Sequence, residues 1–123
     1  MPEPTITNLI DGSANGSINS IGCIDSRYPI GDFSVALGGY SYAPGYNSFA
    51  AASGIASGNR SIALGSSAQA NGDQSFAAVG GKTNGRSSFA TNAGNANGDY
   101  SFAEGRGTAS AECAHAEGEY TNA

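Results

Sequence analysis

The chain has 123 residues and a net charge of −5, and it is poor in large apolar side chains. Three Leu, eight Ile, two Val and five Phe make up about 15% of it, below the ~20% at which a packed core becomes doubtful. Intrinsic disorder usually combines low hydrophobicity with high charge, whereas only 12% of these residues are charged. The chain lacks the apolar area for a conventional helix bundle or doubly wound sheet, which argues against an ordinary small enzyme.

The acidic balance argues against two classes of partner. Electrostatic binding to nucleic acid or to an anionic membrane needs a basic patch, and the chain offers only Arg27, Arg60, Lys82, Arg86 and Arg106. No run of 18 apolar residues is present for a transmembrane helix, and residues 1–4 lack the basic and then apolar order of a signal peptide. Cys23 and Cys113 are 90 positions apart, outside metal-binding spacings, so we expect two free thiols.

Residues 1–19 stand apart from the rest of the chain. Residues 5–7 favour a short strand, and Asp11-Gly12 and Asn15-Gly16 are turn dipeptides. We interpret this segment as an N-terminal cap or a joint to another module. From residue 20 a repeat with steps of 13 or 14 residues begins, marked by Ser20, Ser34, Ser48, Ser61, Ser75, Ser88 and Ser101, with Ala114 in the last place.

Several positions of this repeat keep their character from unit to unit. The residue after each Ser favours β-structure until the last unit, and we call these residues the ladder: Ile21, Val35, Phe49, Ile62, Phe76, Phe89, Phe102 and His115. The next residue is Gly22 or an Ala, and a second column of small residues, mostly Ala, lies further along each unit. A Gly closes the units at Gly31, Gly45, Gly58, Gly72, Gly85 and Gly98, which predicts turns with positive φ there.

A unit of this length favours an all-β solenoid over residues 20–123, with two short strands and two turns in each coil. It is too short for a helical hairpin, so helix is excluded there. Because strand residues alternate between faces, the ladder and its neighbouring Ala residues look in opposite directions. Either the Ala columns fill a thin interior and the ladder lies outside, or the Phe residues fill a wider coil and Ala forms an interface.

Both arrangements predict an obligate homo-oligomer. An exposed apolar stripe marks an interface, and an Ala interior buries too little to offset the ~1 to 2 kcal/mol per residue of backbone ordering. At ~4.8 Å per coil, about seven and a half coils form a column roughly 35 Å tall, with an incomplete last coil. The ladder is therefore the predicted subunit interface or core.

Three segments of the repeat carry a family resemblance: Asn47-Ser48-Phe49-Ala50, Ser61-Ile62-Ala63-Leu64-Gly65 and residues 70–77. They resemble the YadA-like head repeat of trimeric autotransporter adhesins, over about residues 20–123. The resemblance implies a left-handed parallel β-roll that exists as a homotrimer, whose surface binds a host, with no catalysis and no cofactor. We expect the chain to depart from that family, because the sequence shows no pattern typical of a signal peptide, a coiled-coil stalk or a membrane anchor.

A second resemblance concerns the context of the repeat. Residues 8–14, residues 28–31, Ser101-Phe102-Ala103-Glu104-Gly105 and Ala114-His115-Ala116-Glu117-Gly118 resemble head-like segments of bacteriophage and prophage tail fibres. This favours a trimeric fibre module of a virion, or another extracellular appendage, joined to other fibre modules and binding a bacterial surface glycan or protein. The alternative is the head of a bacterial cell-surface adhesin that binds host protein. Ice binding would require regular Thr columns, and the chain has none.

Four tyrosines form the candidate receptor patch: Tyr28, Tyr40, Tyr42 and Tyr46. Exposed tyrosines suit sugar stacking or protein contact, and the alternative is packing at the junction with the N-terminal cap.

Two further features are weighed against binding roles. His115 is the only histidine of the sequence. Either three copies of it meet near the axis of a trimer and hold a metal or anion, or it packs in the slot that Phe holds in earlier coils. Asp32, Asp73 and Asp99 follow turn glycines and either bind calcium or cap the turns, and the second role fits better because the Asp-rich nonapeptide pattern is absent.

Overall fold

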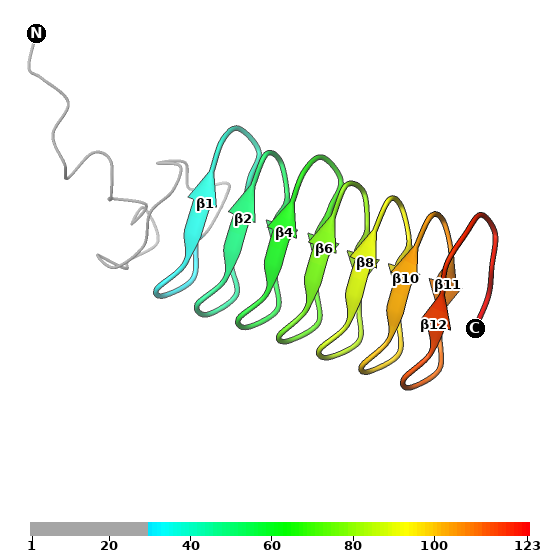
Figure 1. The fold of residues 1–123 in the computed structure, drawn as a ribbon. Helices are drawn as coiled ribbons and strands as arrows, with labels where there is room; N and C mark the ends of the chain where they lie inside the picture. Colours follow the sequence, from blue (N-terminus) through cyan, green and yellow to red (C-terminus); the bar gives the residue numbers. More distant parts are fainter. Residues whose placement is uncertain (1–29) are drawn as a thin grey trace, which may run out of the picture.

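The computed structural model describes residues 30–123, which form one parallel β-solenoid (Figure 1). The predicted cap at residues 1–19, the boundary at residue 20, Ile21 and Tyr28 lie outside the described residues. Within residues 30–123, no helix is long and apolar enough to cross a membrane. The predicted all-β solenoid is confirmed for this part of the chain.

The five middle coils each contribute one strand to each of two sheets, whereas the first and last coils reach the second sheet only through isolated bridges, Tyr42 to Ile55 and Asn122 to Thr108. The seven-stranded sheet, called sheet A, runs in the order β1 (Val35–Leu37), β2 (Phe49–Ala51), β4 (Ile62–Leu64), β6 (Phe76–Ala78), β8 (Phe89–Thr91), β10 (Phe102–Glu104) and β12 (His115–Ala116). The five-stranded sheet, called sheet B, comprises β3 (Ile55–Ala56), β5 (Gln69–Ala70), β7 (Lys82–Thr83), β9 (Asn95–Ala96) and β11 (Thr108–Ala109). All pairings are parallel, so each coil stacks on the next.

The pairing register stacks each column of the repeat on itself. Val35 pairs with Phe49, 14 residues further on, and Phe49 pairs with Ile62, 13 residues further on. Phe89 lies between Phe76 and Phe102 in the same way. A position in one coil therefore meets the same position in the coils above and below, and this is why the sequence columns are so uniform.

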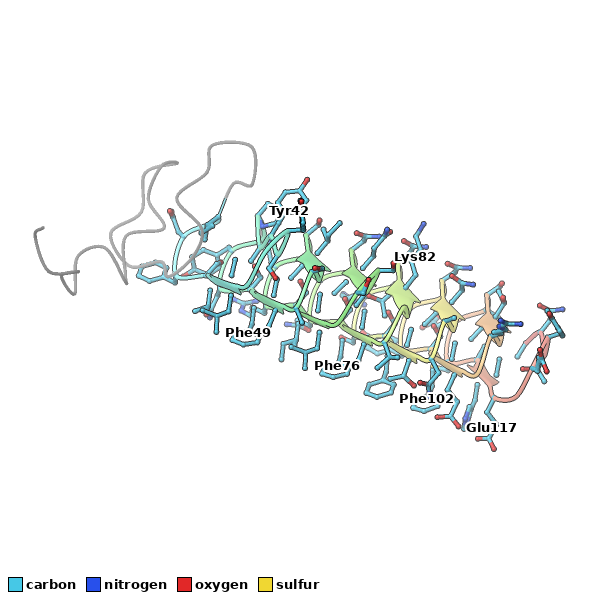
Figure 2. All side chains as sticks on the ribbon, turned by 90° about the horizontal axis from the view of Figure 1, so that it is seen from above. Tyr42, Phe49, Phe76, Lys82, Phe102 and Glu117 are labelled. Atoms are coloured by element: carbon cyan, nitrogen blue, oxygen red, sulfur yellow. The ribbon has the colours of Figure 1, made fainter. Side chains whose placement is uncertain are left out.

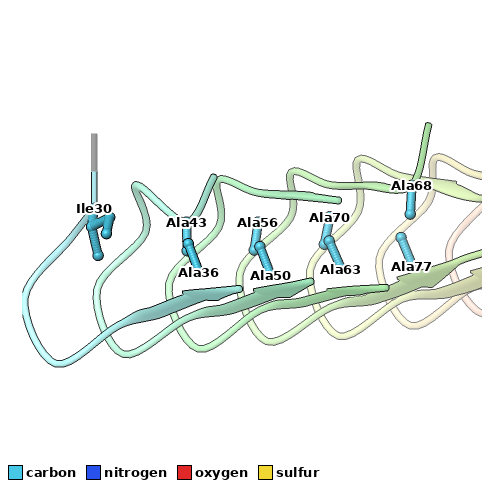
Figure 3. Packing of buried hydrophobic residues seen from close by; sticks show 9 residues of the cluster. All are labelled: Ile30, Ala36, Ala43, Ala50, Ala56, Ala63, Ala68, Ala70 and Ala77. Atoms are coloured by element: carbon cyan, nitrogen blue, oxygen red, sulfur yellow. The ribbon is translucent and has the colours of Figure 1, made fainter. Parts of the chain in front are cut away.

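The interior of the coil is filled by alanine. The inward residues of the two sheets face each other (Figure 3) and are at most 2% exposed: Ala36, Ala43, Ala50, Ala56, Ala63, Ala70, Ala77, Ala90, Ala96, Ala103, Ala109 and Ala116. The prediction of a thin interior with the ladder outside is thus confirmed, and the alternative with Phe inside is wrong. Two facing methyl groups fill the space between the sheets, so a phenyl ring has no room there.

Ile30 lies at the N-terminal end of the interior and is 5% exposed, and within the two sheets the exception among the inward residues is Thr83. It occupies an Ala position of sheet B and is fully buried. Its Oγ1 donates a hydrogen bond to Ser75 Oγ at 2.8 Å, which satisfies the added hydroxyl. Among the described residues, no buried side-chain nitrogen or oxygen lacks a partner.

The Ser column is also buried, and its hydroxyl groups hold the corners of the coils together. Oγ of Ser61, Ser75 and Ser88 donates to the carbonyl of the Gly three residues earlier, each at 2.6 Å. A buried carbonyl left without a donor would cost about 1–3 kcal/mol. Ser is therefore present because it is small enough for the corner and carries the donor that the corner needs.

The turn glycines recur in each unit of the repeat for a reason that the sequence interpretation missed. Gly58, Gly72 and Gly85 do not adopt positive φ. A Cβ on any of them would come within 3.0 Å of a backbone carbonyl in the next coil, a contact that real Cβ atoms do not make. The predicted positive φ at this column is wrong, because close stacking of the corners is what requires glycine.

Positive φ falls instead on the residue just before each Ser. Arg60, Gln74 and Ser87 have φ values of 58°, 57° and 54°, in the left-handed region that side chains usually avoid. The hydrogen bonds between coils hold them there. For example, Gln74 N donates to Asn59 O at 2.8 Å.

The opposite turn, which leads from sheet A to sheet B, sets the length of the coil. In a 13-residue coil it has two consecutive residues with positive φ, such as Asn92 (51°) and Ala93 (65°), as in a type I′ turn. In a 14-residue coil, Gly65 (97°) and Ser67 (65°) are separated by one more residue. The residue missing from the shorter units is therefore lost near the middle of the unit, as the sequence predicts.

Stacking at the corners makes a direct prediction. Gly85→Ala should lower the free energy of unfolding by about 2 kcal/mol or more, because the added methyl group overlaps the backbone of the next coil. Gly39→Ala is the matched control, since a Cβ there meets nothing within 4 Å and φ is not positive, and its effect should stay within about 0.5 kcal/mol. Urea unfolding followed by circular dichroism measures both. Equal midpoints for the two variants would contradict this role of the corner glycines.

Candidate functional site

The outward face of sheet A carries two columns of side chains, because each three-residue strand has a buried Ala between two outward residues. The first column is the predicted ladder, present in the described residues as Val35, Phe49, Ile62, Phe76, Phe89, Phe102 and His115. The second column contains Leu37, Ala51, Leu64, Ala78, Thr91, Glu104 and Glu117. Figure 2 shows Phe49, Phe76 and Phe102 along one side of the solenoid, with Glu117 beyond them.

The rings of the ladder stack along this face. The centroids of Phe76 and Phe89 are 5.0 Å apart and those of Phe89 and Phe102 are 4.9 Å apart, with interplanar angles of 8° and 3°. The stack still leaves much of the face open, since Ile62 is 38% and Leu37 46% exposed. A continuous apolar stripe of this length is uncommon on a monomeric protein and marks an interaction surface.

The last two coils change the character of the same face. His115 occupies the slot held by Phe in the preceding coils, as predicted, and its ring meets Phe102 edge-on at 4.6 Å. His115 Nε2 lies 3.2 Å from Glu117 Oε2. Glu104 lies one coil earlier in the column of Glu117. Within residues 30–123, no group of three His, Cys, Asp or Glu side chains in one chain could hold a metal ion.

The outward face of sheet B is polar over most of its length. After Tyr42 and Ile55, its first column continues as Gln69, Lys82, Asn95 and Thr108. Beside it runs a row of amides, in which Asn71 Nδ2 donates to Asn84 Oδ1 at 3.1 Å and Asn84 Nδ2 donates to Asn97 Oδ1 at 2.7 Å. The sequence reasoning missed this amide row. The signal was present, because each of these Asn residues directly precedes a corner glycine.

The described residues of the predicted tyrosine patch are divided between the two turns of one coil. Tyr40 lies in the turn between the sheets and is 72% exposed, whereas Tyr42 lies on the face of sheet B, where it bridges to Ile55. Tyr46 lies in the opposite turn and packs edge-on against Phe33, with centroids 5.7 Å apart. The expectation of a single cluster is therefore wrong for Tyr46, which lies at the turn opposite Tyr40, and a receptor role for the tyrosines stays a prediction.

The acidic turn residues cap the backbone of neighbouring coils. Asp73 Oδ1 accepts a hydrogen bond from Asn59 N at 2.9 Å, and Asp99 Oδ1 accepts one from Arg86 N at 2.8 Å. These contacts confirm turn capping for Asp73 and Asp99. Each carboxylate bridges one coil to the preceding coil, so it contributes to stacking.

Basic side chains at the turns pair within the same chain. Arg86 Nη2 donates to Tyr100 Oη at 2.7 Å, and Arg106 Nη1 lies 3.2 Å from Glu119 Oε1. Both pairs are well exposed, so each contributes little to stability. Cys113 is a free, exposed thiol, as predicted, and Cys23 lies outside the described residues.

The comparisons with known proteins agree with the geometry. Residues 30–51 and 56–80 match the model of the YadA head domain repeat, in two copies. Neither the curated proteins nor the solved structures gave a match. The two matched segments cover the first coils of the described solenoid, and the later coils continue the same register.

Proposed function

We propose that this chain, whose residues 30–51 and 56–80 match the model of the YadA head domain repeat, forms the non-enzymatic head of a homotrimeric fibre. In this proposal the outward face of sheet A packs against the same face of two other copies. The observation that carries it is the unbroken apolar ladder from Val35 to Phe102, half-buried within one chain.

The energetics of a single coil support an obligate assembly. Burying apolar surface contributes about 25 cal/mol per Å², and an interior of alanine methyl groups offers little such surface. Ordering the backbone costs about 1–2 kcal/mol per residue. The large side chains that could close this gap are concentrated outside the coil, so the part of their apolar surface that one chain leaves exposed stabilises the fold only when another surface covers it.

A copy of the same chain suits this face better than an unrelated partner. From β1 to β8 the face carries no charged side chain, so identical copies meet without repulsion. The ladder is straight and repeats once per coil, so three parallel copies bring equivalent residues to the same level. The polar face of sheet B and the charged turns then remain in water, which suits the outside of a fibre.

We place this head in a phage-type fibre or a similar extracellular appendage, where it joins other fibre modules and displays a surface for a bacterial glycan or protein. Its location would then be the virion or the cell exterior. The resemblance of Ala114-His115-Ala116-Glu117-Gly118 to fibre segments supports this placement. The second candidate is the head of a bacterial cell-surface adhesin that binds host protein, which the YadA head repeats support equally.

A charge in the ladder tests the assembly. Phe89→Glu should convert a species of three chain masses into monomers, because three carboxylates would meet in an apolar interface. Asn95→Glu is the matched control, since Asn95 faces outward from sheet B in the same coil, and this variant should remain trimeric. Light scattering coupled to size exclusion measures the mass of each. A folded monomeric parent chain, or dissociation of both variants alike, would overturn the proposed interface.

Adsorption to bacterial cells tests the receptor surface. Replacing Tyr40 and Tyr42 together by Ala should weaken adsorption of labelled protein at least tenfold while leaving the trimer intact, since exposed aromatics carry much of a binding surface. Tyr120→Ala is the control, because Tyr120 holds the equivalent turn position at the other end, with φ of 60° against 61° for Tyr40. Unchanged adsorption of the double variant would exclude these tyrosines. Binding of the parent to host protein only would favour the second candidate.

A further inference from the structure

The ladder face has a charged end, and all of its charged side chains lie in the last two coils of the described residues. Glu104 on β10, and His115 and Glu117 in the coil of β12, follow a face that is uncharged from β1 to β8. Figure 2 shows Glu117 at the C-terminal end, on the side that carries Phe102. The surface that the proposed function covers with copies of the chain is therefore apolar for most of its length and ionisable at one end.

Within one chain, the groups around His115 are acidic. Its Nε2 lies 3.2 Å from Glu117 Oε2, with 58% of the histidine side chain and 65% of the glutamate side chain exposed. Glu104 faces outward from the neighbouring strand, and Glu112 and Cys113 lie in the turn before β12. The adjacent strand of sheet B, β11, carries only Thr108 and Ala109.

No permanent cation balances these carboxylates on the face itself. Among residues 30–123, Lys82 lies on sheet B, and Arg60, Arg86 and Arg106 lie in turns. Arg86 is paired with Asp99 and Arg106 with Glu119. The imidazole of His115 is thus the one basic group on the ladder face in this part of the chain.

We infer that the C-terminal end of the trimer interface is an acid-strengthened contact between copies of this chain, an inference that rests on the proposed trimer. Three-fold packing of the ladder faces gathers the imidazole and one carboxylate from the last coil of each chain, with Glu104 one coil earlier, at the same end of the interface. When the imidazoles are neutral, the carboxylates repel one another across the interface. When the imidazoles are protonated, each one pairs with carboxylates of its own chain and of the next.

The direction of the pH effect follows from linkage. Gathering carboxylates around an imidazole favours its protonated form, so the trimer binds more protons than three separate chains. Association therefore strengthens as the pH falls through the range in which imidazoles titrate, between about 8 and 5. Below about pH 4 the carboxylates themselves take up protons, and the advantage is lost.

The experiment measures trimer dissociation by sedimentation at pH 8.0 and pH 5.5, at equal ionic strength and with EDTA present, so that the proton is the only ligand varied. The parent chain should dissociate at about tenfold lower concentration at pH 5.5 than at pH 8.0. His115→Phe continues the apolar ladder and should be tight at both pH values. His115→Gln carries no charge at either pH and should be equally weak at both, which keeps the test valid if the Phe variant misfolds.

Glu119→Gln is the control for surface charge, because Glu119 pairs with Arg106 at a turn, and it should keep the pH dependence of the parent. A parent trimer with the same dissociation at both pH values would overturn the inference and leave the proposed trimer standing. A pH dependence that persists in both His115 variants would also overturn it. A parent that is monomeric at both pH values would instead overturn the proposed function, and the inference with it.

Discussion

The stacking distance between coils is the constraint on which the rest of this structure depends. Parallel strands hydrogen-bond at a spacing of about 4.8 Å, so every residue lies directly above and below the same position in neighbouring coils. At the corners this leaves no space for a Cβ, and glycine is required at positions such as Gly72. At the same corner, the hydroxyl of Ser75 donates a hydrogen bond to the Gly72 carbonyl. The sequence repeats because the contacts between coils require the same residue types at the same positions of each coil.

A second consequence concerns where the large side chains lie. Because the two sheets are close enough for the methyl groups of Ala50 and Ala56 to meet inside, residues as large as Phe49 are excluded from the interior. They accumulate on sheet A, in a column that one chain leaves half-covered. The alanine interior of one coil is small, so cohesion depends on contacts between neighbouring coils and, in the proposed trimer, on the surface that each copy would share with the others.

The sequence correctly predicted which residues face inward and outward, because this follows from strand alternation. It did not predict which corner residues adopt positive φ, because this depends on the backbone torsion angles. Alternation places Phe76 and Ala77 on opposite faces whatever the turns do, and residue size then selects Ala for the inside. The torsion angles of a corner cannot be inferred from composition, so positive φ was assigned to Gly85, whereas Ser87 adopts it. The prediction of a single tyrosine cluster was wrong for a related reason, since closeness in sequence does not show which side of a coil Tyr40 and Tyr46 occupy.

The end of the ladder shows how such a repeat acquires a specific property without changing its fold. His115 keeps the backbone register of Phe102, and its ring remains in contact with that of Phe102, so the coil tolerates the exchange. Stability in a solenoid is approximately a sum over coils and their interfaces, and a substitution in one coil therefore acts locally. In the proposed trimer, the apolar coils would supply a contact that is independent of pH. The two coils with ionisable side chains would then adjust its strength at one end.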